Sequence, residues 1–269
     1  MKWINKNLLL ALAVLFAGSL AAQDQFSKEY SIPLSNPNAP GKLKVDLYNG
    51  GITVEGYSGK EVVITMKTYA SEEDNERSKE GLRRIPNTGV EFEIVEDNNE
   101  VEIDGNHRGR TDFIVKVPQN FGLSISTHHN GDVVVRNVSG EIEVDAHHGG
   151  MELENVSGTV VADTHHGGIK VVFNSVKSGS PMAFSTYHGD VDITFPGNTN
   201  ASAKMKSDRG DIFADFDLKT ATPEPQKMQT TEGGRRKIEI SSWIYANIGS
   251  GGPEYMFTTH HGDIIIRKK

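Results

Sequence analysis

The sequence predicts an all-β fold and, within that class, a single-stranded β-solenoid with coils of about 18–22 residues. Two observations support this prediction. A short glycine-containing motif recurs at nearly constant spacing through most of the chain, and apolar residues alternate with polar ones on both sides of it. One such unit cannot bury its apolar face alone, whereas stacked units share a continuous core.

The recurring motif is a polar residue, then Asn or His, then Gly, then Gly or Asp, followed by alternating apolar residues. Its copies are centred on Gly50, Gly131, Gly149, Gly167, Gly189, Gly210 and Gly262. Successive glycines from Gly131 to Gly210 lie 18, 18, 22 and 21 residues apart. A second turn, Asn-Val-Ser-Gly, stands halfway through two units, at 137–140 and 155–158. Each unit is therefore predicted to be strand, turn, strand, turn.

The strands between these turns alternate with a period of two, which is typical of strands with one buried face. Acidic residues such as Glu141 and Glu143 occupy the alternate positions. The apolar positions expected to share the buried face are Val133, Val135, Ile142, Val144, Met151, Leu153, Val160, Ala162, Ile169 and Val171.

The motif also makes a prediction about backbone conformation. Asn-Gly is the strongest signal for a tight turn with positive φ at both central residues. Histidine, like Asn and Asp, is enriched at positive φ. We therefore expect positive φ at the residue before each motif glycine, namely Asn49, Asn130, His148, His166, His188 and His261.

Three segments depart from the regular coils within one predicted domain that spans residues 23–269. Residues 71–84 are highly charged and predict a short helix or a loop. Residues 90–103 predict a hairpin that turns at Asp97, Asn98 and Asn99. Residues 217–236 predict a surface excursion between coils. We hypothesise that the hairpin and the charged segment cap one end of the solenoid, since exposed strand edges invite aggregation.

The first 22 residues predict a cleaved signal peptide. Lys2 and Lys6 precede the apolar run Leu8–Leu20, and small residues lead to a cleavage site near Ala22. The apolar run is short of the roughly 20 residues that span a bilayer. Because the sequence contains no cysteine, we expect no lipid anchor, no disulfide and no Cys-ligated metal. The expected location is the periplasm or the cell surface, without stable membrane insertion.

The charge of the chain limits its partners. Removing residues 1–22 takes away two lysines and no acid, so 26 Lys and Arg side chains remain against 36 Asp and Glu, a formal charge of −10. An acidic chain without a basic stripe is a poor partner for nucleic acid or an anionic membrane surface. We therefore expect no nucleic-acid partner.

A resemblance to a known family begins at Phe113–Pro118, which ends in a Val-x-Val-Pro strand, and continues through Leu123–Thr127 and Asn130–Val133. With the closing Thr-x-x-Gly-Asp-Ile at 259–264, these residues resemble the bacterial "putative adhesin" family of exported domains of unknown function. The resemblance extends from about Leu43 to Arg267. It implies an exported, right-handed, β-helix-like fold with a surface or adhesive role, and it brings no catalytic residues. The abundance of histidine at the turns departs from the family.

Nine of the ten histidines lie in the recurring motif. If coils stack about 4.8 Å apart, equivalent turns form a ladder along one edge, where imidazoles could share a Zn²⁺, Cu²⁺ or Ni²⁺ ion. The alternative is that they are turn residues copied by duplication, although a positive-φ turn accounts for only one histidine of each pair. The candidate metal ligands are His129, His147, His148, His165, His166 and His188, with Asp132, Asp145, Asp163 and Asp190 as nearby oxygen ligands.

The aspartates that follow the motif glycines allow two interpretations. Carboxylates on β-helix rungs can act in glycan hydrolysis, whereas Asp at a turn ordinarily caps the backbone. The column Asp132, Asp190, Asp211 and Asp263 alternates with glycines and shows no paired-carboxylate signature, so we expect capping. A nucleophile elbow, a phosphate loop and a dinucleotide fingerprint are all missing. We predict no catalytic and no cofactor-binding residues.

The sequence therefore predicts a non-enzymatic, exported cell-envelope protein that presents a flat, repetitive surface to a glycan or to an envelope protein. Thr164, Thr186, Tyr187 and Thr259 are expected to form exposed columns suited to carbohydrate. Two alternatives stay open: a divalent-metal-binding envelope protein built on the histidine ladder, and a polysaccharide-degrading enzyme on a β-helix scaffold. A groove with clustered carboxylates and exposed aromatic residues would favour the enzyme.

Overall fold

The computed structural model describes residues 25–69, 92–105, 109–221, 226–232, 235–241 and 243–269. In these ranges the regular structure consists of strands, and none of it is a helix long and apolar enough to cross a membrane. The predicted all-β class is confirmed. The expected signal peptide at 1–22 and the charged segment at 71–84 lie outside the described residues.

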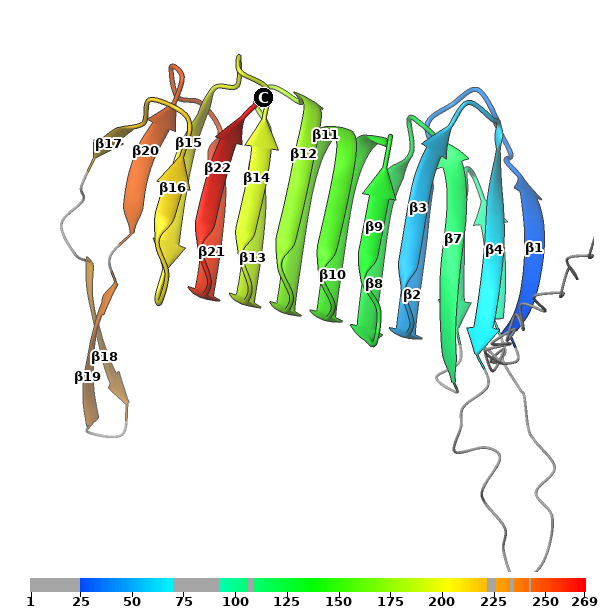
Figure 1. Ribbon diagram of the computed structural model, residues 1–269, viewed down its shortest axis with the longest axis horizontal. Coiled ribbons are helices and arrows are strands. Elements are labelled where there is room, and N and C mark those ends of the chain that lie inside the picture. Colours follow the sequence, from blue (N-terminus) through cyan, green and yellow to red (C-terminus); the bar gives the residue numbers. More distant parts are fainter. Residues whose placement is uncertain (1–24, 70–91, 106–108, 222–225, 233–234, 242) are drawn as a thin grey trace, which may run out of the picture.

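The strands stand side by side in a long row, in two layers that we call the first and the second stack (Figure 1). In spatial order the first stack is β5 (Phe92–Asp97), β6 (Glu100–Gly105), β2 (Lys42–Asn49), β8 (Gly122–His129), β10 (Ser139–His148), the second half of β11 (Met151–His166), β13 (Met182–His188), β21 (Glu254–His261), β15 (Ala201–Ser207), β20 (Ile244–Ile248) and β17 (Lys219–Ala221).

The second stack lies behind the same core. In spatial order it is β1 (Gln25–Pro33), β4 (Glu61–Tyr69), β7 (Arg110–Pro118), β3 (Ile52–Tyr57), β9 (Val133–Arg136), the first half of β11, β12 (Ile169–Val176), β14 (Val191–Phe195), β22 (Ile264–Lys268) and β16 (Ile212–Ala214). Because β11 runs through both stacks, the 20 strands form one folded-over sheet.

Strand pairing in this sheet is mixed. The middle strands of both stacks pair in parallel, as a solenoid-like arrangement requires, whereas β1, β4, β5, β17 and β20 pair antiparallel at the ends. The stacked, solenoid-like arrangement of coils is therefore present, but it gives way to antiparallel pairing at both ends. The right-handed winding stays a prediction.

The order of coils in space differs from their order in the chain. The last coil of the chain, β21 with β22, pairs on one side with β13 and β14 and on the other with β15 and β16. Likewise, β2 and β3 lie between β6 and β7 on one side and β8 and β9 on the other. The repeat predicted the coils but not this order.

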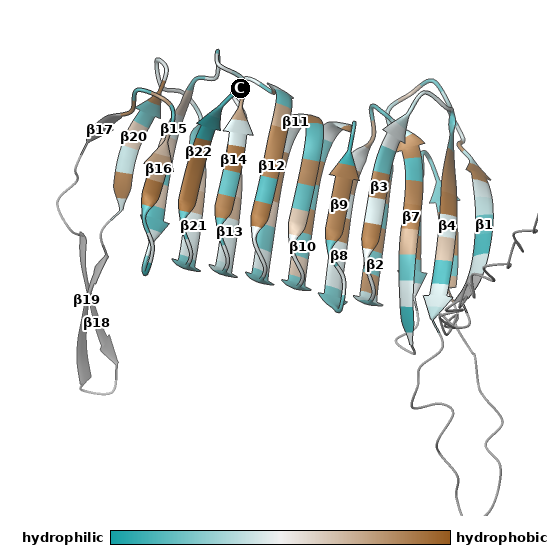
Figure 2. Cartoon of the chain, in the orientation of Figure 1, coloured by the Kyte–Doolittle hydropathy of each residue, from teal (hydrophilic) through white to brown (hydrophobic). Residues whose placement is uncertain are grey.

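The core lies between the two stacks, and the alternation of hydropathy along each strand is visible in Figure 2. All ten apolar positions predicted to share one face are at most 2 % exposed. Aromatic rings fill the core toward β14, where Phe195 stacks on Phe173 with ring centroids 5.2 Å apart and on Tyr255 at 5.4 Å. Burial of this continuous apolar face is the main source of stability for stacked units.

The other predicted turns are also present. Asn98 and Asn99 have positive φ and join β5 to β6 as an antiparallel hairpin that ends the first stack. Asn137 and Asn155 also have positive φ, although the second of these corners is a bend inside the continuous strand β11. Asn155 Nδ2 donates to Asn137 Oδ1 at 2.6 Å, which ties one corner to the next.

In the segment 217–236 and just after it, the structure contains β17 and a separate two-stranded sheet of β18 (Gln226–Glu232) and β19 (Arg235–Ser241). These two strands pair antiparallel with one another. The division of the chain into a signal peptide, one domain and two insertions stays a prediction.

Candidate functional site: the histidine edge

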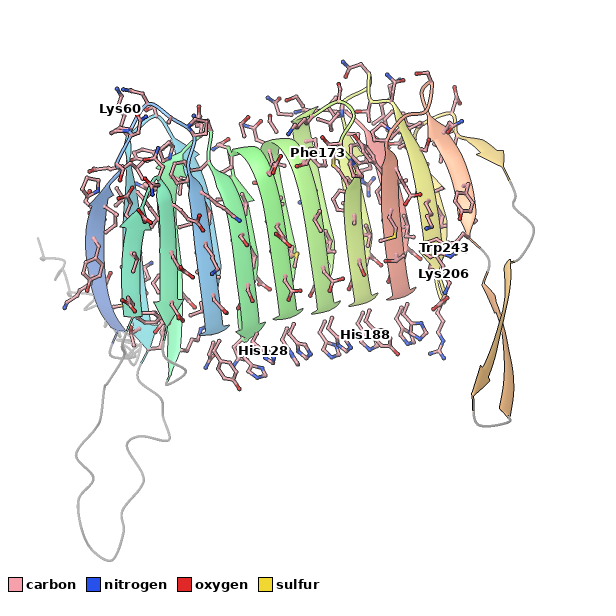
Figure 3. The ribbon with its side chains drawn as sticks, turned by 180° about the vertical axis from the view of Figure 1, so that it is seen from behind. Lys60, His128, Phe173, His188, Lys206 and Trp243 are labelled. Atoms are coloured by element: carbon pink, nitrogen blue, oxygen red, sulfur yellow. The ribbon has the colours of Figure 1, made fainter. Side chains whose placement is uncertain are left out.

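The strands of the first stack end along one long edge of the molecule, and the motif histidines project there. Figure 3 labels His128 and His188 on this edge. Two files of side chains run along it, and we call them together the histidine edge. The first file is Tyr48, His128, His147, His165, Tyr187 and His260; the second file is Asn49, His129, His148, His166, His188 and His261.

The rings of the first file stack face to face across neighbouring coils. The centroids of His147 and His165 are 5.1 Å apart with an interplanar angle of 4°, and those of His165 and Tyr187 are 5.0 Å apart, also at 4°. The remaining steps range from 4.6 to 5.4 Å. Parallel strand pairing places equivalent side chains at the strand spacing, so the stack follows directly from the register.

The tyrosines of this file were missed as members of the ladder. Tyr48 and Tyr187 occupy the first position of the pair in their copies of the motif, where the other copies have histidine. Alignment of the copies residue by residue was the signal that could have found them. The file is therefore a row of flat rings rather than a row of imidazoles alone.

The two files end at charged side chains of the β15 coil. His260 Nδ1 lies 2.7 Å from Asp208 Oδ2, and Arg209 Nη1 lies 3.1 Å from His261 Nε2. Lys206 Nζ lies 3.1 Å from the other carboxylate oxygen of Asp208. The hydrogen bonds of Asp208 with His260 and Lys206 hold the pKa of Asp208 below its usual value, with the bond to His260 as the larger cause.

The predicted positive φ at the histidines is wrong. His148, His166, His188 and His261 do not have positive φ, whereas the glycine that follows each of them does, from +138° at Gly189 to +154° at Gly262. Asn130 is the only residue of the predicted set with positive φ, at 55°. Since His148 and His166 end ordinary strands, tolerance of a left-handed backbone does not explain either histidine of a pair.

The predicted exposed columns are also wrong for threonine. Thr164, Thr186 and Thr259 are at most 5 % exposed, whereas Tyr187 is exposed as expected. Each threonine hydroxyl donates to the carbonyl of a motif glycine in a neighbouring coil, as Thr186 Oγ1 does to Gly167 O at 2.8 Å. The buried threonines therefore stabilise the turns beneath the histidine edge by hydrogen bonds from the core side.

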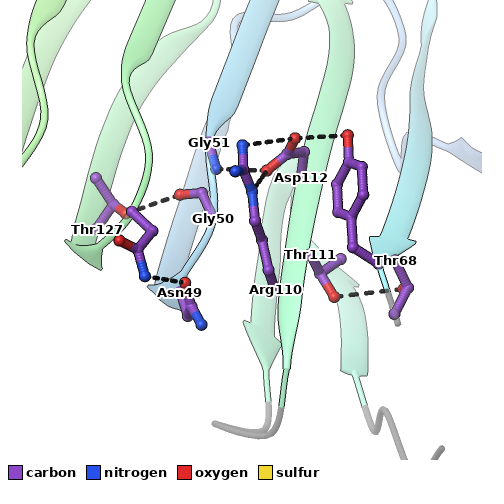
Figure 4. Close-up of polar contacts among 10 residues, drawn as sticks. Asn49, Gly50, Gly51, Thr68, Arg110, Thr111, Asp112 and Thr127 are labelled. Atoms are coloured by element: carbon purple, nitrogen blue, oxygen red, sulfur yellow. Dashed lines mark hydrogen bonds and ion pairs between the residues drawn. The ribbon is translucent and has the colours of Figure 1, made fainter. Parts of the chain in front are cut away.

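The aspartates after the motif glycines bind backbone between coils. Gly150 N donates to Asp132 Oδ1, Asp263 N to Asp190 Oδ1 and Asp211 N to Asp263 Oδ1, each at 2.8 Å. Figure 4 shows the equivalent contact at the first motif, where Gly51 N donates to Asp112 Oδ1 at 2.9 Å. Their use as backbone acceptors agrees with the expected capping role.

Comparisons with known proteins place this arrangement in a family. The family model described as Toastrack DUF4097 matches residues 122–267, from the start of β8 into β22. The chain belongs to the Toastrack DUF4097 family. The resemblance drawn from the sequence is thereby confirmed, and the family is one of unknown function.

Solved structures of similar proteins carry adhesin names. A "putative cell adhesion protein" from Clostridium sporogenes is 14 % identical, with a TM-score of 0.41, 91 % of this chain covered and 100 % of that one. A "putative adhesin" from Bacteroides fragilis is 10 % identical, with a TM-score of 0.42, 92 % of this chain covered and 98 % of that one. No curated protein matches the chain.

At two positions of the Toastrack histidine edge, His148 and His261, the surroundings favour the neutral imidazole. Partial removal from water, followed by the neighbouring imidazoles of His147 and His166, lowers the pKa of His148. Removal from water and the Arg209 guanidinium lower the pKa of His261. On the strand face beside the first file, desolvation and the Asp163 carboxylate raise the pKa of Asp145.

The distances between candidate metal ligands differ between neighbouring coils and within one coil. Across neighbouring coils, the ring centroids of His147 and His165 are 5.1 Å apart. Within one coil, however, His147 Nδ1 and His148 Nδ1 are 2.9 Å apart. Over the described residues, no group of three or more His, Asp or Glu side chains is arranged to hold an ion. The metal ligands stay a prediction.

Proposed function

We propose that this protein is a non-enzymatic, exported cell-envelope protein of the adhesin kind that binds a linear envelope glycan along the histidine edge. The observation that carries the proposal is the unbroken file of six rings from Tyr48 to His260, repeated at the spacing of the strands. A surface with one repeating unit suits a partner with a repeating unit, and a polysaccharide is such a partner.

The chemistry of the edge supports a neutral, polar partner. Imidazoles with a lowered pKa are uncharged near neutral pH and offer one donor and one acceptor each. The rings stack on one another, so their edges rather than their faces meet solvent. Ring edges of this kind form hydrogen bonds, directly or through water, with hydroxyl groups.

The outward face of the first stack extends this surface. Next to the first file lie Ser126, Asp145, Asp163, Ser185 and Thr258 in one row across neighbouring strands. Charges are paired on the outward faces of both stacks: on the first, Lys44 contacts Glu102, and on the second, Arg136 contacts Glu154 at 3.0 Å. The bidentate contact of Arg267 with Asp192 is a further example. Because the row from Ser126 to Thr258 adjoins the first file, a glycan bound along the histidine edge would also meet the outward face of the first stack.

The test is a binding measurement with purified envelope polysaccharides immobilised on a surface, using protein purified after export. The comparison variant carries His128→Asn, His147→Asn and His165→Asn, which keeps the edge polar and removes three stacked rings. We expect binding of at least one polysaccharide by the unchanged protein and a loss of about tenfold or more in the variant, since several contacts are lost together.

The matched control is Lys116→Gln on the outward face of β7, which we expect to bind as the unchanged protein does. Assay of the bound glycan for released sugar tests the non-enzymatic part, and we expect no cleavage. Binding that is equal in the triple variant would refute the role of the histidine edge. Cleavage that requires Asp145 or Asp163 would instead support the polysaccharide-degrading alternative.

A second candidate function is divalent-metal binding, favoured by the 2.9 Å between His147 Nδ1 and His148 Nδ1. Two nitrogens so close suit adjacent positions around Cu²⁺ or Ni²⁺ in square-planar geometry. Calorimetric titration with Zn²⁺, Cu²⁺ and Ni²⁺ tests it, beside a variant in which His147, His148, His165 and His166 are changed to Asn. Micromolar, stoichiometric binding that the variant loses would support this candidate, and absence of binding would exclude it.

A further inference from the structure

The edge opposite the histidine edge holds a cavity of about 390 Å³. It lies among segment 174–179, which is the end of β12 and the loop after it, and the loops 196–200 and 251–253, and the side chain of Tyr255 forms part of its wall. Figure 3 labels Phe173, the residue of β12 before the first of these segments, near this edge. The cavity therefore belongs to the corners between β12 and β13, between β14 and β15, and between β20 and β21.

The walls of the cavity are uncharged. Its polar side chains are amides and hydroxyls, among them Asn174, Asn198, Thr199 and Tyr255, and Asp, Glu, Lys and Arg are missing from its lining. Val176 and two prolines supply apolar surface beside them. In a chain with 36 Asp and Glu and 28 Lys and Arg, an uncharged cavity selects against ions and for neutral ligands.

Two hydroxyl groups belong to the lining of the cavity. Tyr255 is 1 % exposed, its ring stacks on Phe195, and its side chain forms part of the wall. Burial also raises the pKa of Tyr255, so the hydroxyl keeps its proton and can donate. Thr199 is 3 % exposed, and its Oγ1 is buried without a partner in the described part of the chain. Buried polar groups of native proteins are ordinarily paired.

The cavity is held in shape by its own backbone. Thr199 N donates to Pro196 O at 3.0 Å, and Gly251 N donates to Ile248 O at 3.1 Å. The Asn200 Oδ1 accepts from both the backbone N and the Oγ of Ser250, at 2.8 and 2.9 Å, which joins two of the loops. A cavity built in this way exists before a ligand arrives, so little ordering cost opposes binding.

We infer that this cavity is a binding site for a neutral, hydroxyl-rich ligand of the size of one saccharide unit. Its volume lies at the lower end of the range for small-molecule sites. Hydroxyl and amide groups beside an apolar wall, with the buried Thr199 Oγ1 unpaired in the described part of the chain, match the hydroxyl groups and the C–H surface of a neutral sugar. The site is separate from the histidine edge, so this inference does not rest on the proposed function.

The test is an NMR titration of ¹⁵N-labelled protein, purified after export, with glucose, galactose, mannose and N-acetylglucosamine. Glucuronate and glucosamine serve as charged comparisons. We expect at least one neutral sugar to shift amide signals of 174–179, 196–200 and 251–253 in a saturable way, and the charged sugars to bind more weakly. Tyr255→Phe and Thr199→Val keep the shape of their side chains, and each is expected to weaken binding by about fivefold, the effect of one lost hydrogen bond.

The controls separate this site from the histidine edge. His188→Asn is expected to leave the sugar titration unchanged, and Tyr255→Phe to leave glycan binding at the histidine edge unchanged. Thermal unfolding of both cavity variants confirms that they fold. The inference is overturned if none of the neutral sugars shifts these signals at saturating concentration. It is equally overturned if folded Tyr255→Phe and Thr199→Val bind the sugar as tightly as the unchanged protein.

Discussion

The ring nitrogens Nδ1 of His147 and His148 face each other at 2.9 Å. One of them must donate and the other accept, so at least one of the two imidazoles is neutral in this arrangement. Each ring also lies against the histidines of neighbouring coils, His147 in the first file and His148 in the second. A proton that binds one imidazole ring therefore lies close to several other imidazole rings, where a second positive charge would be repelled.

This relationship predicts stability that depends on pH. The pKa of His148 and that of His261 lie below the ordinary 6.5, so below pH 6.5 the unfolded chain binds protons that the folded protein does not. Acidification from pH 7.5 to 5.5 is therefore expected to lower the melting temperature. In a variant with His148→Asn and His261→Asn, the melting temperature should fall less over the same pH range. A melting temperature of the unchanged protein that rises on acidification would contradict the argument.

A second prediction concerns the buried threonines beneath the histidine edge. Thr186→Val removes the bond from Oγ1 to Gly167 O and leaves that carbonyl with one bond fewer. We expect the free energy of unfolding to fall by about 1 kcal/mol. Thr258→Val, on the outward face of the neighbouring strand β21, is the matched control and should change little. Denaturant unfolding measures both, and equal effects at the two sites would contradict a stabilising role for the hydrogen bond from Thr186 Oγ1 to Gly167 O.

Two adjacent glycines provide a third prediction. Gly149 has a φ of +143°, and a Cβ there would lie 2.1 Å from the carbonyl oxygen of Gly131 in the next coil. Gly149→Ala is expected to cost about 3 kcal/mol or more, or to prevent folding. At Gly150 the nearest atom would be 3.5 Å away, an ordinary contact, so Gly150→Ala should be nearly neutral. Chemical unfolding compares them, and similar stabilities would disprove the close approach of the coils.

The aspartate column gives a fourth prediction. Asp190 Oδ1 accepts from the backbone of Asp263 at 2.8 Å, across the junction with the last coil of the chain. Asp190→Ala is expected to lower the free energy of unfolding by about 1 kcal/mol, because the site is exposed to solvent and its charge is screened. Asp190→Asn retains an oxygen acceptor, so its free energy of unfolding should fall by less than half as much as that of Asp190→Ala. If both lose equally, the hydrogen bond is not the source of the effect.

The sequence was a good guide to everything that repeats. The glycine motif and the alternation around Val133 or Ile169 predicted strands, buried faces and the ladder of histidines, because these features depend on neighbours within one unit. The sequence was misleading where a contact with the next coil determines whether a side chain is buried. Thr164 and Thr186 appeared exposed but turn inward, since the glycine carbonyl they bind belongs to another coil.

By itself, the sequence determined the all-β class, the coil and the family. Only the tertiary structure decided which coil lies next to which, as with β21 and β22 between β13–β14 and β15–β16. The physical reason is that every copy of the motif offers the same backbone edge and similar apolar faces, so pairing within the motif favours no particular neighbour. The order is settled by long-range contacts, such as the junctions at Asp190 and Asp208 and the antiparallel strands at the two ends. The uncharged cavity at the far edge arises in the same way, from loops that are distant in the chain.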